Sequence, residues 1–77
     1  MFEIYGSKDC RFCVKAKEIL KRHHKEYTFI DVMENDNVFA AFSKKFPKVS
    51  RVPQILLEDG VHIGGYRELE RWLNHTE

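Results

Sequence analysis

The spacing of hydrophobic and polar positions changes several times along this chain. Runs in which apolar, aromatic and β-branched side chains alternate or cluster predict strands over 2–5, 27–32, 54–58 and 61–63. Apolar positions three or four residues apart predict helices after the first, second and fourth strands. The predicted element order is therefore β-α-β-α-β-β-α.

The three predicted helices are amphipathic. The first runs from about Cys10 to about His23, with lysines on its outer side. The second begins near Asn35, because Asn and Asp side chains cap helix N-termini, and Pro47 ends it. Its predicted core side chains are Phe39, Phe42 and Phe46. The third helix follows a glycine pair, and its predicted buried stripe is Tyr66, Leu69, Trp72 and Leu73.

These elements predict a single small α/β domain over residues 1–77. The first two strands are expected to be parallel, because a strand–helix–strand crossover is right-handed and returns the chain in the same direction. Asp59-Gly60 predicts a two-residue hairpin, which adds two antiparallel strands. The expected architecture is thioredoxin-like, a four-stranded mixed sheet flanked by three helices that cover both faces.

The composition excludes several functional classes. With 43% hydrophobic and 13% aromatic residues the chain is globular, and a net charge of +1 argues against nucleic-acid or membrane-surface binding. No apolar run approaches the roughly 20 residues that span a bilayer, and the N-terminus lacks a signal-peptide pattern. We therefore expect a cytoplasmic protein, and the lack of an obvious apolar patch predicts a monomer.

The two cysteines, Cys10 and Cys13, lie where the first predicted strand leads into the first helix. A C-x-x-C pair at such a junction suits thiol–disulfide exchange. The helix N-terminus supplies backbone N–H groups and the positive end of the helix dipole, and both favour a thiolate. The loop between the two cysteines is too short for a structural disulfide to stabilise the fold. The pattern predicts redox chemistry at Cys10, with the more shielded Cys13 as its partner.

Three other interpretations of the pair are disfavoured, one of them an iron–sulfur cluster bridged by glutathione between two copies of the chain. Half a zinc site completed by His23 or His24 is disfavoured, because adjacent histidines point to different helix faces and there is no second cysteine pair. A non-catalytic interaction module is disfavoured by the intact dithiol at a helix start. The redox interpretation predicts no bound metal.

Two further motifs fall at the end of the sheet that carries the cysteines. Arg51-Val52-Pro53-Gln54 leads into the third strand, and Gly64-Gly65-Tyr66 leads into the third helix. With the C-x-x-C, they resemble the glutaredoxin family over nearly the whole chain, most of all the short glutaredoxins of tailed bacteriophages. The resemblance implies a thiol–disulfide oxidoreductase that reduces protein disulfides and glutathione mixed disulfides. It also implies glutathione as co-substrate, no tightly bound cofactor, and ribonucleotide reductase as a partner.

The resemblance assigns roles to individual residues. Cys10 is the attacking cysteine and Cys13 resolves its mixed disulfide with a protein. Pro53 matches a cis-proline that faces the dithiol, so that the Val52 N–H and C=O can pair with a bound peptide such as glutathione. The chain departs from the family at two places in the C-x-x-C. Arg11 replaces a proline, and Phe12 keeps the ring of a tyrosine without its hydroxyl.

Glutathione carries two carboxylates, and the chain offers several groups to meet them. The candidates are the side chains of Lys8, Arg11, Arg51 and Arg67 and the N–H groups of Gly65 and Tyr66. Exposed Phe12 is a candidate substrate contact. Arg67 stands where the family often has an acidic residue, and an aromatic residue followed by Arg resembles redoxins that thioredoxin reductase reduces. A thioredoxin-like electron donor that does not use glutathione is therefore the alternative function.

Overall fold

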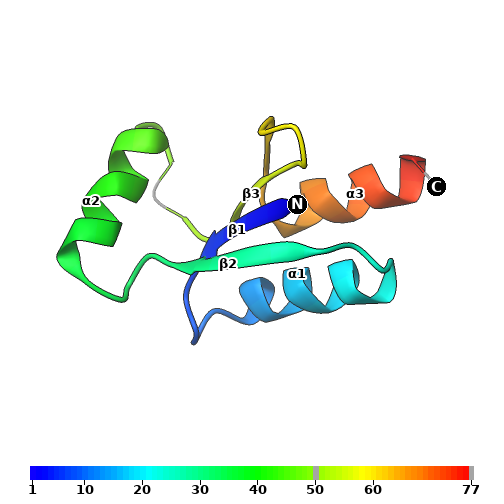
Figure 1. The fold of residues 1–77 in the computed structure, drawn as a ribbon, viewed down its shortest axis with the longest axis horizontal. Coiled ribbons are helices and arrows are strands. Elements are labelled where there is room, and N and C mark those ends of the chain that lie inside the picture. The colour runs from blue at the N-terminus through cyan, green and yellow to red at the C-terminus, as the bar shows by residue number, and fades with distance from the viewer. Residues whose placement is uncertain (50, 77) are drawn as a thin grey trace.

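The computed structural model describes residues 1–49 and 51–76, and its helices and strands follow the predicted order (Figure 1). The elements are β1 (Phe2–Gly6), α1 (Arg11–Arg22), β2 (Tyr27–Asp31), α2 (Asp36–Lys45), β3 (Gln54–Leu56), β4 (His62–Gly64) and α3 (Tyr66–Thr76). Asn35 caps α2 as predicted, because its side-chain oxygen accepts a hydrogen bond from the Val38 N–H at 2.9 Å.

The four strands form one mixed sheet in the order β2-β1-β3-β4. β1 is parallel to β2 and antiparallel to β3, and β4 is antiparallel to β3. The predicted fold class is thus confirmed. In this arrangement three strand ends meet at one end of the sheet: the C-terminal ends of β1 and β4 and the N-terminal end of β3. The topology therefore brings the three sequence motifs together there.

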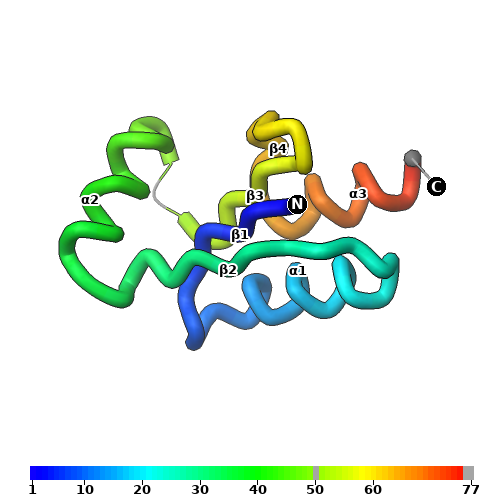
Figure 2. Tube along the Cα trace, in the orientation of Figure 1, coloured from blue at the N-terminus to red at the C-terminus, as the bar shows by residue number. Residues whose placement is uncertain are grey.

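The main core lies between the sheet and the pair formed by α1 and α3. Phe2 and Ile4 of β1 point into it and are fully buried. The same cluster contains Ala16, Ile19, Leu20, Ile55, Leu69 and Leu73. Figure 2 shows α1 and α3 running close to the strands, whereas α2 stands apart at one end. This core holds α1, whose first turn carries the dithiol, against the sheet.

A second, smaller core lies on the opposite face of the sheet, where α2 packs. It contains Val32, Phe42, Phe46 and Leu56, with Tyr5 packed against it. Helices therefore cover both faces, as predicted. The prediction that Phe39 belongs to the core was wrong, because its side chain is 47% exposed. Phe39 lies in the first half of α2, whereas this helix meets the sheet through Phe42 and its C-terminal cap residue Phe46.

The β3–β4 connection is one residue longer than the predicted two-residue hairpin. The Leu57 N–H donates to the Val61 carbonyl at 2.8 Å, and the Gly60 N–H donates to the Leu57 carbonyl at 2.9 Å. Three residues, 58–60, therefore form the loop, and Gly60 takes the left-handed φ of 89° that such a loop requires. β4 therefore covers His62–Gly64, one residue later than predicted, and only Gly65 separates it from the start of α3 at Tyr66.

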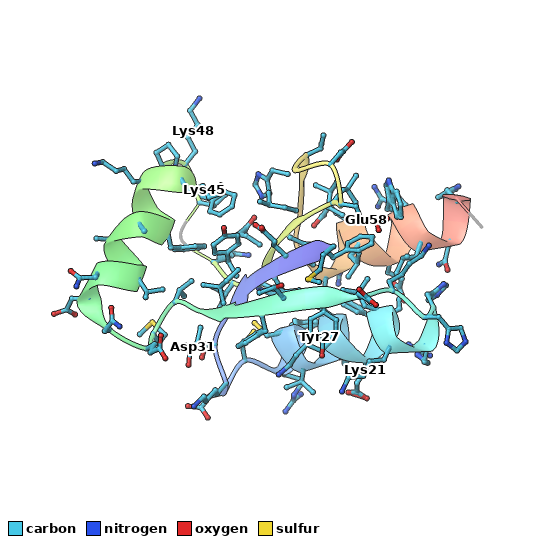
Figure 3. The ribbon with its side chains drawn as sticks, in the orientation of Figure 1. Lys21, Tyr27, Asp31, Lys45, Lys48 and Glu58 are labelled. Atoms are coloured by element: carbon cyan, nitrogen blue, oxygen red, sulfur yellow. The ribbon has the colours of Figure 1, made fainter. Side chains whose placement is uncertain are left out.

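Charged side chains cover the outer surfaces of the helices. Lys48 extends beyond the end of α2, near Lys45, and Lys21 lies on the outer side of α1 (Figure 3). Within residues 1–49 and 51–76, no helix combines the length and the apolar character needed to cross a bilayer.

Candidate active site

Cys10 is the N-cap residue of α1. Its sulfur accepts a hydrogen bond from the Cys13 N–H at 3.1 Å, in the way that a side-chain oxygen caps other helices. The Cys10 carbonyl accepts the first helical bond, from the Val14 N–H at 3.1 Å. A thiolate at this position is stabilised by the donated hydrogen bond and by the positive end of the helix dipole. Because Cys10 is partly exposed, this sulfur can be reached by a substrate.

Cys13 lies one turn into α1 and is fully buried. Burial raises the pKa of its thiol from an ordinary 9.0 to about 12, and the hydrogen bond with Cys10 acts in the same direction. A backbone hydrogen bond from Ser7 and the charge of Lys17 lower the pKa by smaller amounts. The two thiols thus have different environments, one partly exposed at the helix start and one buried and protonated at neutral pH. The two cysteines do not form a disulfide in this structure.

The Arg51–Pro53 segment faces the dithiol from the start of β3. The Val52–Pro53 peptide bond is cis, in agreement with the expectation from the sequence. The Val52 carbonyl lies 3.7 Å from the Cys10 Sγ, within reach of a weak S–H···O contact. The two residues are far apart in the sequence, and the antiparallel pairing of β1 with β3 brings them together.

A shallow pocket of about 310 Å³ lies beside this segment. It gathers most of the predicted binding residues: Phe12, Arg51, Val52, Pro53, Gly65, Tyr66 and Arg67. Two other residues line it that the sequence analysis did not single out as binding residues, Gln54 and Glu68. Lys8 and Arg11 are exposed on the approach to Cys10 and do not line the pocket. The pocket lining therefore contains the apolar and cationic side chains that the sequence predicted. It also contains the carboxylate of Glu68 and the amide of Gln54.

Two aromatic rings form one side of the pocket. The Phe12 side chain is 46% exposed, as predicted, and its ring centroid lies 5.9 Å from that of Tyr66. The Lys15 Nζ lies 5.1 Å from the centre of the Phe12 ring. The pair connects the start of α1 to the start of α3, and it leaves an apolar surface next to Cys10.

Glu68 changes the expected role of the glycine turn. Its Oε1 accepts a hydrogen bond from the Gly65 N–H at 2.7 Å, which is the side-chain-to-backbone half of a capping box. In this structure a carboxylate of the chain itself therefore occupies the N–H that the sequence assigned to a ligand carboxylate, and that assignment stays a prediction. The spacing of Glu68, three residues after the glycine, is a signal that sequence analysis could have used.

Gln54 is the residue of the Arg51-Val52-Pro53-Gln54 motif to which the sequence assigned no role. It follows Pro53, and its side chain is only 6% exposed. The sequence feature that could have pointed to Gln54 is its position, as a polar residue at the start of an apolar run. Gln54 and His62 make a short side-chain contact, with Oε1 and Nε2 2.7 Å apart.

Metal binding has no support among residues 1–49 and 51–76. In that part of the chain, no three His, Cys, Asp or Glu side chains are grouped so that they could hold an ion. His23 and His24, considered above as zinc ligands, therefore do not form such a group with the cysteines.

Comparisons with known proteins agree with this geometry. The family model described as Glutaredoxin matches residues 2–63. Glutaredoxin 1 of Salmonella typhimurium is 37% identical over 75 residues, which cover 90% of this chain and 85% of that protein. The glutaredoxin of Enterobacteria phage T4 is 29% identical over 85 residues, which cover 94% of this chain and 98% of that protein.

The fold also matches solved structures. Glutaredoxin 1 from Francisella tularensis, complexed with cacodylate, superposes with a TM-score of 0.75 and 27% identity, covering 97% of this chain and 93% of that one. A buckwheat glutaredoxin–glutathione complex superposes with a TM-score of 0.80 at 18% identity, over 97% of this chain and 69% of that one, and so supports the fold alone. By its sequence, its sheet topology and its dithiol, this chain belongs to the glutaredoxin family of thiol–disulfide oxidoreductases.

Proposed function

We propose that this glutaredoxin reduces glutathione mixed disulfides and protein disulfides, with glutathione as its electron donor. The observation that carries the proposal is the pocket next to Cys10, in which Arg51, Arg67 and Glu68 surround an apolar lining. Glutathione has two carboxylates, one ammonium group and a peptide backbone. Two guanidinium groups and one carboxylate match these charges.

The proposed reaction begins at Cys10. Its thiolate attacks one sulfur of the substrate disulfide, a new sulfur–sulfur bond forms, and the displaced thiolate takes a proton from solvent. When the partner is a protein, Cys13 loses its proton and attacks Cys10. This closes the Cys10–Cys13 disulfide and releases the protein as a thiol. Two molecules of glutathione then reduce the Cys10–Cys13 disulfide and leave as glutathione disulfide.

Peptide binding in this proposal uses the Val52 backbone. The Val52 carbonyl lies 3.7 Å from the Cys10 sulfur, so a cysteine joined to Cys10 would lie beside the same residue. A peptide there can pair with Val52 as an added strand. Phe12 and Tyr66 would contact the apolar part of the ligand, while Lys8 and Arg11 would attract its carboxylates on approach.

A thioredoxin-like donor that does not use glutathione is the second candidate. Two observations favour it. Arg67 lines the pocket, and the Gly65 N–H is already bonded to Glu68, which leaves one donor fewer for a glutathione carboxylate. In this alternative a thioredoxin reductase would reduce the Cys10–Cys13 disulfide, and Arg51 and Arg67 would contact the protein partner.

NADPH consumption by the purified protein separates the two functions. One assay supplies glutathione and glutathione reductase with a small glutathione mixed disulfide. The other supplies thioredoxin reductase alone with a protein disulfide. Turnover in the first assay supports the glutaredoxin proposal. Turnover only in the second would reject it in favour of the thioredoxin-like donor.

We further propose that residues 1–77 act as one domain and as a monomer in the cytosol, and that ribonucleotide reductase is among the protein substrates. A C-x-x-C pair whose loop is too short for a stabilising structural disulfide suits a reducing compartment, where such a dithiol is catalytic. Reduction of oxidised ribonucleotide reductase by the purified protein would test the partner, and sedimentation of the reduced protein would test the monomer.

A further inference from the structure

Gln54 is the one polar side chain that the structure buries within residues 1–49 and 51–76. A buried carboxamide is costly unless both of its ends are hydrogen-bonded. The Gln54 Nε2 donates to the Arg51 carbonyl at 3.0 Å, and its Oε1 lies 2.7 Å from the His62 Nε2. Because Oε1 can only accept, the His62 Nε2 must carry the proton in this contact. The orientation of the amide is thereby fixed from both sides.

The carbonyl that Gln54 holds belongs to the peptide group joining Arg51 to Val52. A peptide group is planar, and its C=O and N–H point in opposite directions. A hydrogen bond that fixes the Arg51 carbonyl therefore also fixes the direction of the Val52 N–H. The Val52 carbonyl, in turn, lies 3.7 Å from the Cys10 sulfur. Gln54 is thus placed to orient a donor next to the reactive sulfur without contacting that sulfur itself.

His62 is also contacted by α2, which packs on the same face of the sheet. Its ring centroid lies 4.6 Å from that of Phe46, the residue that caps α2. Phe46 belongs to the second core, together with Phe42 and Leu56. The contacts therefore run from this core through His62 and Gln54 to the Arg51 carbonyl. Such a continuous set of packed and hydrogen-bonded groups can hold a backbone segment rigidly.

We propose that Gln54, supported by His62, is a positioning residue that sets the Arg51–Val52 peptide group for pairing with the peptide part of a disulfide substrate. The inference rests on the proposed function, since it assumes a peptide bound along Val52. In the exchange step the Cys10 thiolate forms a bond to one substrate sulfur, and the other sulfur leaves as a thiolate and is protonated. Gln54 takes no part in these bond changes. It affects how the substrate sulfur is aligned.

The decisive variant is Gln54→Glu, which keeps the size of the side chain and the acceptor for His62. It removes the donor to the Arg51 carbonyl and places a carboxylate oxygen there instead. We would measure its second-order rate constants with two disulfides, a cysteine-containing peptide disulfide without glutathione and 4,4′-dithiodipyridine, which has no peptide backbone. We expect a loss of about five- to tenfold with the peptide, in line with one misplaced hydrogen bond, and an unchanged rate with dithiodipyridine.

A second variant, His62→Phe, keeps the contact with Phe46 and removes the hydrogen bond to Gln54. It is expected to show a smaller loss that is again confined to the peptide substrate. His75→Phe, an exposed histidine on α3, is the matched control and should behave as wild type. If Gln54→Glu does not fold, His62→Phe decides the question.

Equal losses with both disulfides would mean that Gln54 only stabilises the fold, and no loss with the peptide would mean that it does not orient Val52. Either result overturns the inference. A failure of the proposed function gives another result, because the wild-type protein would then show no turnover with glutathione. The rate constants with the peptide disulfide and with dithiodipyridine could still be measured and compared.

Discussion

Gly6 packs directly against the sulfur of Cys13. A Cβ atom at position 6 would lie 2.6 Å from the Cys13 Sγ and 3.1 Å from the ring of Phe29. Real carbon–sulfur contacts are not that short, so no larger side chain fits at the end of β1 unless the thiol moves. The last residue of the first strand therefore helps to determine where the buried member of the dithiol lies.

Gly6→Ala should displace the Cys13 thiol. We expect a loss of about 1–3 kcal/mol in the free energy of unfolding, typical of overpacking in a core. We also expect slower closure of the Cys10–Cys13 disulfide, because the shifted Cys13 sulfur would lie differently relative to Cys10. Urea unfolding and stopped-flow measurement of disulfide closure would check both. Wild-type stability together with a wild-type closure rate would show that the site can relax around a methyl group.

The two cysteines should differ when each is replaced. Cys10→Ser removes the exposed attacking sulfur, and we expect it to abolish all turnover. Cys13→Ser should retain reduction of glutathione mixed disulfides, which needs only Cys10, and should lose reduction of protein disulfides. Coupled NADPH assays on both substrate types would measure this. Wild-type activity of Cys13→Ser on both would contradict the resolving role of Cys13.

The raised pKa of Cys13 predicts how stability depends on pH. The pKa of the Cys13 thiol is 9.0 in the unfolded chain and about 12 in the folded one, so between these pH values the unfolded state binds fewer protons. The Cys13 thiol should therefore lower the stability of the reduced protein as the pH rises above about 9, by at most about 1.4 kcal/mol per pH unit.

Cys13→Ser is the control for this pH dependence, because a hydroxyl does not titrate in that range. Urea unfolding of the reduced proteins at pH 7, 9 and 10.5 would compare the two slopes. If the free energy of unfolding fell equally with pH in wild type and Cys13→Ser, the raised pKa of Cys13 would be ruled out.

Lys17 should assist the resolving step. Its Nζ lies 4.3 Å from the centre of the Phe29 ring, and its charge lowers the pKa of Cys13. We expect Lys17→Met to slow Cys13 attack on a mixed disulfide about two- to fivefold at pH 7, because a partly exposed charge contributes up to about 1 kcal/mol. The reaction of Cys10 with an external disulfide should not change. Lys21→Met, exposed on the same helix, is the control, and an equal effect there would exclude a specific role for Lys17.

Glu68 is expected to have two separable effects. Glu68→Ala removes the 2.7 Å hydrogen bond to the Gly65 N–H and should lower stability by about 0.5–2 kcal/mol, as for other lost helix caps. If Glu68 also pairs with the ammonium group of glutathione, the KM for glutathione should rise severalfold. Thermal unfolding and steady-state kinetics measure the two effects, with Glu34→Ala as the surface control. A lower KM would mean instead that Glu68 competes with a ligand carboxylate for the Gly65 N–H.

The sequence by itself determined the order of the elements and the position of the dithiol. Both depend on short-range patterns: alternation in the strands, three- and four-residue spacing in the helices, and a C-x-x-C at the end of a strand. Asn35 could be predicted as a helix cap for the same reason, because its partner, the Val38 N–H, is three residues away. Local geometry depends mainly on neighbours along the chain, and those can be read from a single sequence.

Only the tertiary structure decided which of these groups meet. Phe39 and Phe42 have the same helical pattern, yet only Phe42 reaches the sheet, because the angle at which α2 packs is not encoded in its spacing. The orientation of the Gln54 amide depends on His62, which contacts it across the β3–β4 hairpin. The bonds around Gln54 and the closeness of Gly6 to the Cys13 sulfur arise from packing between distant segments. Periodicity carries no information about such packing.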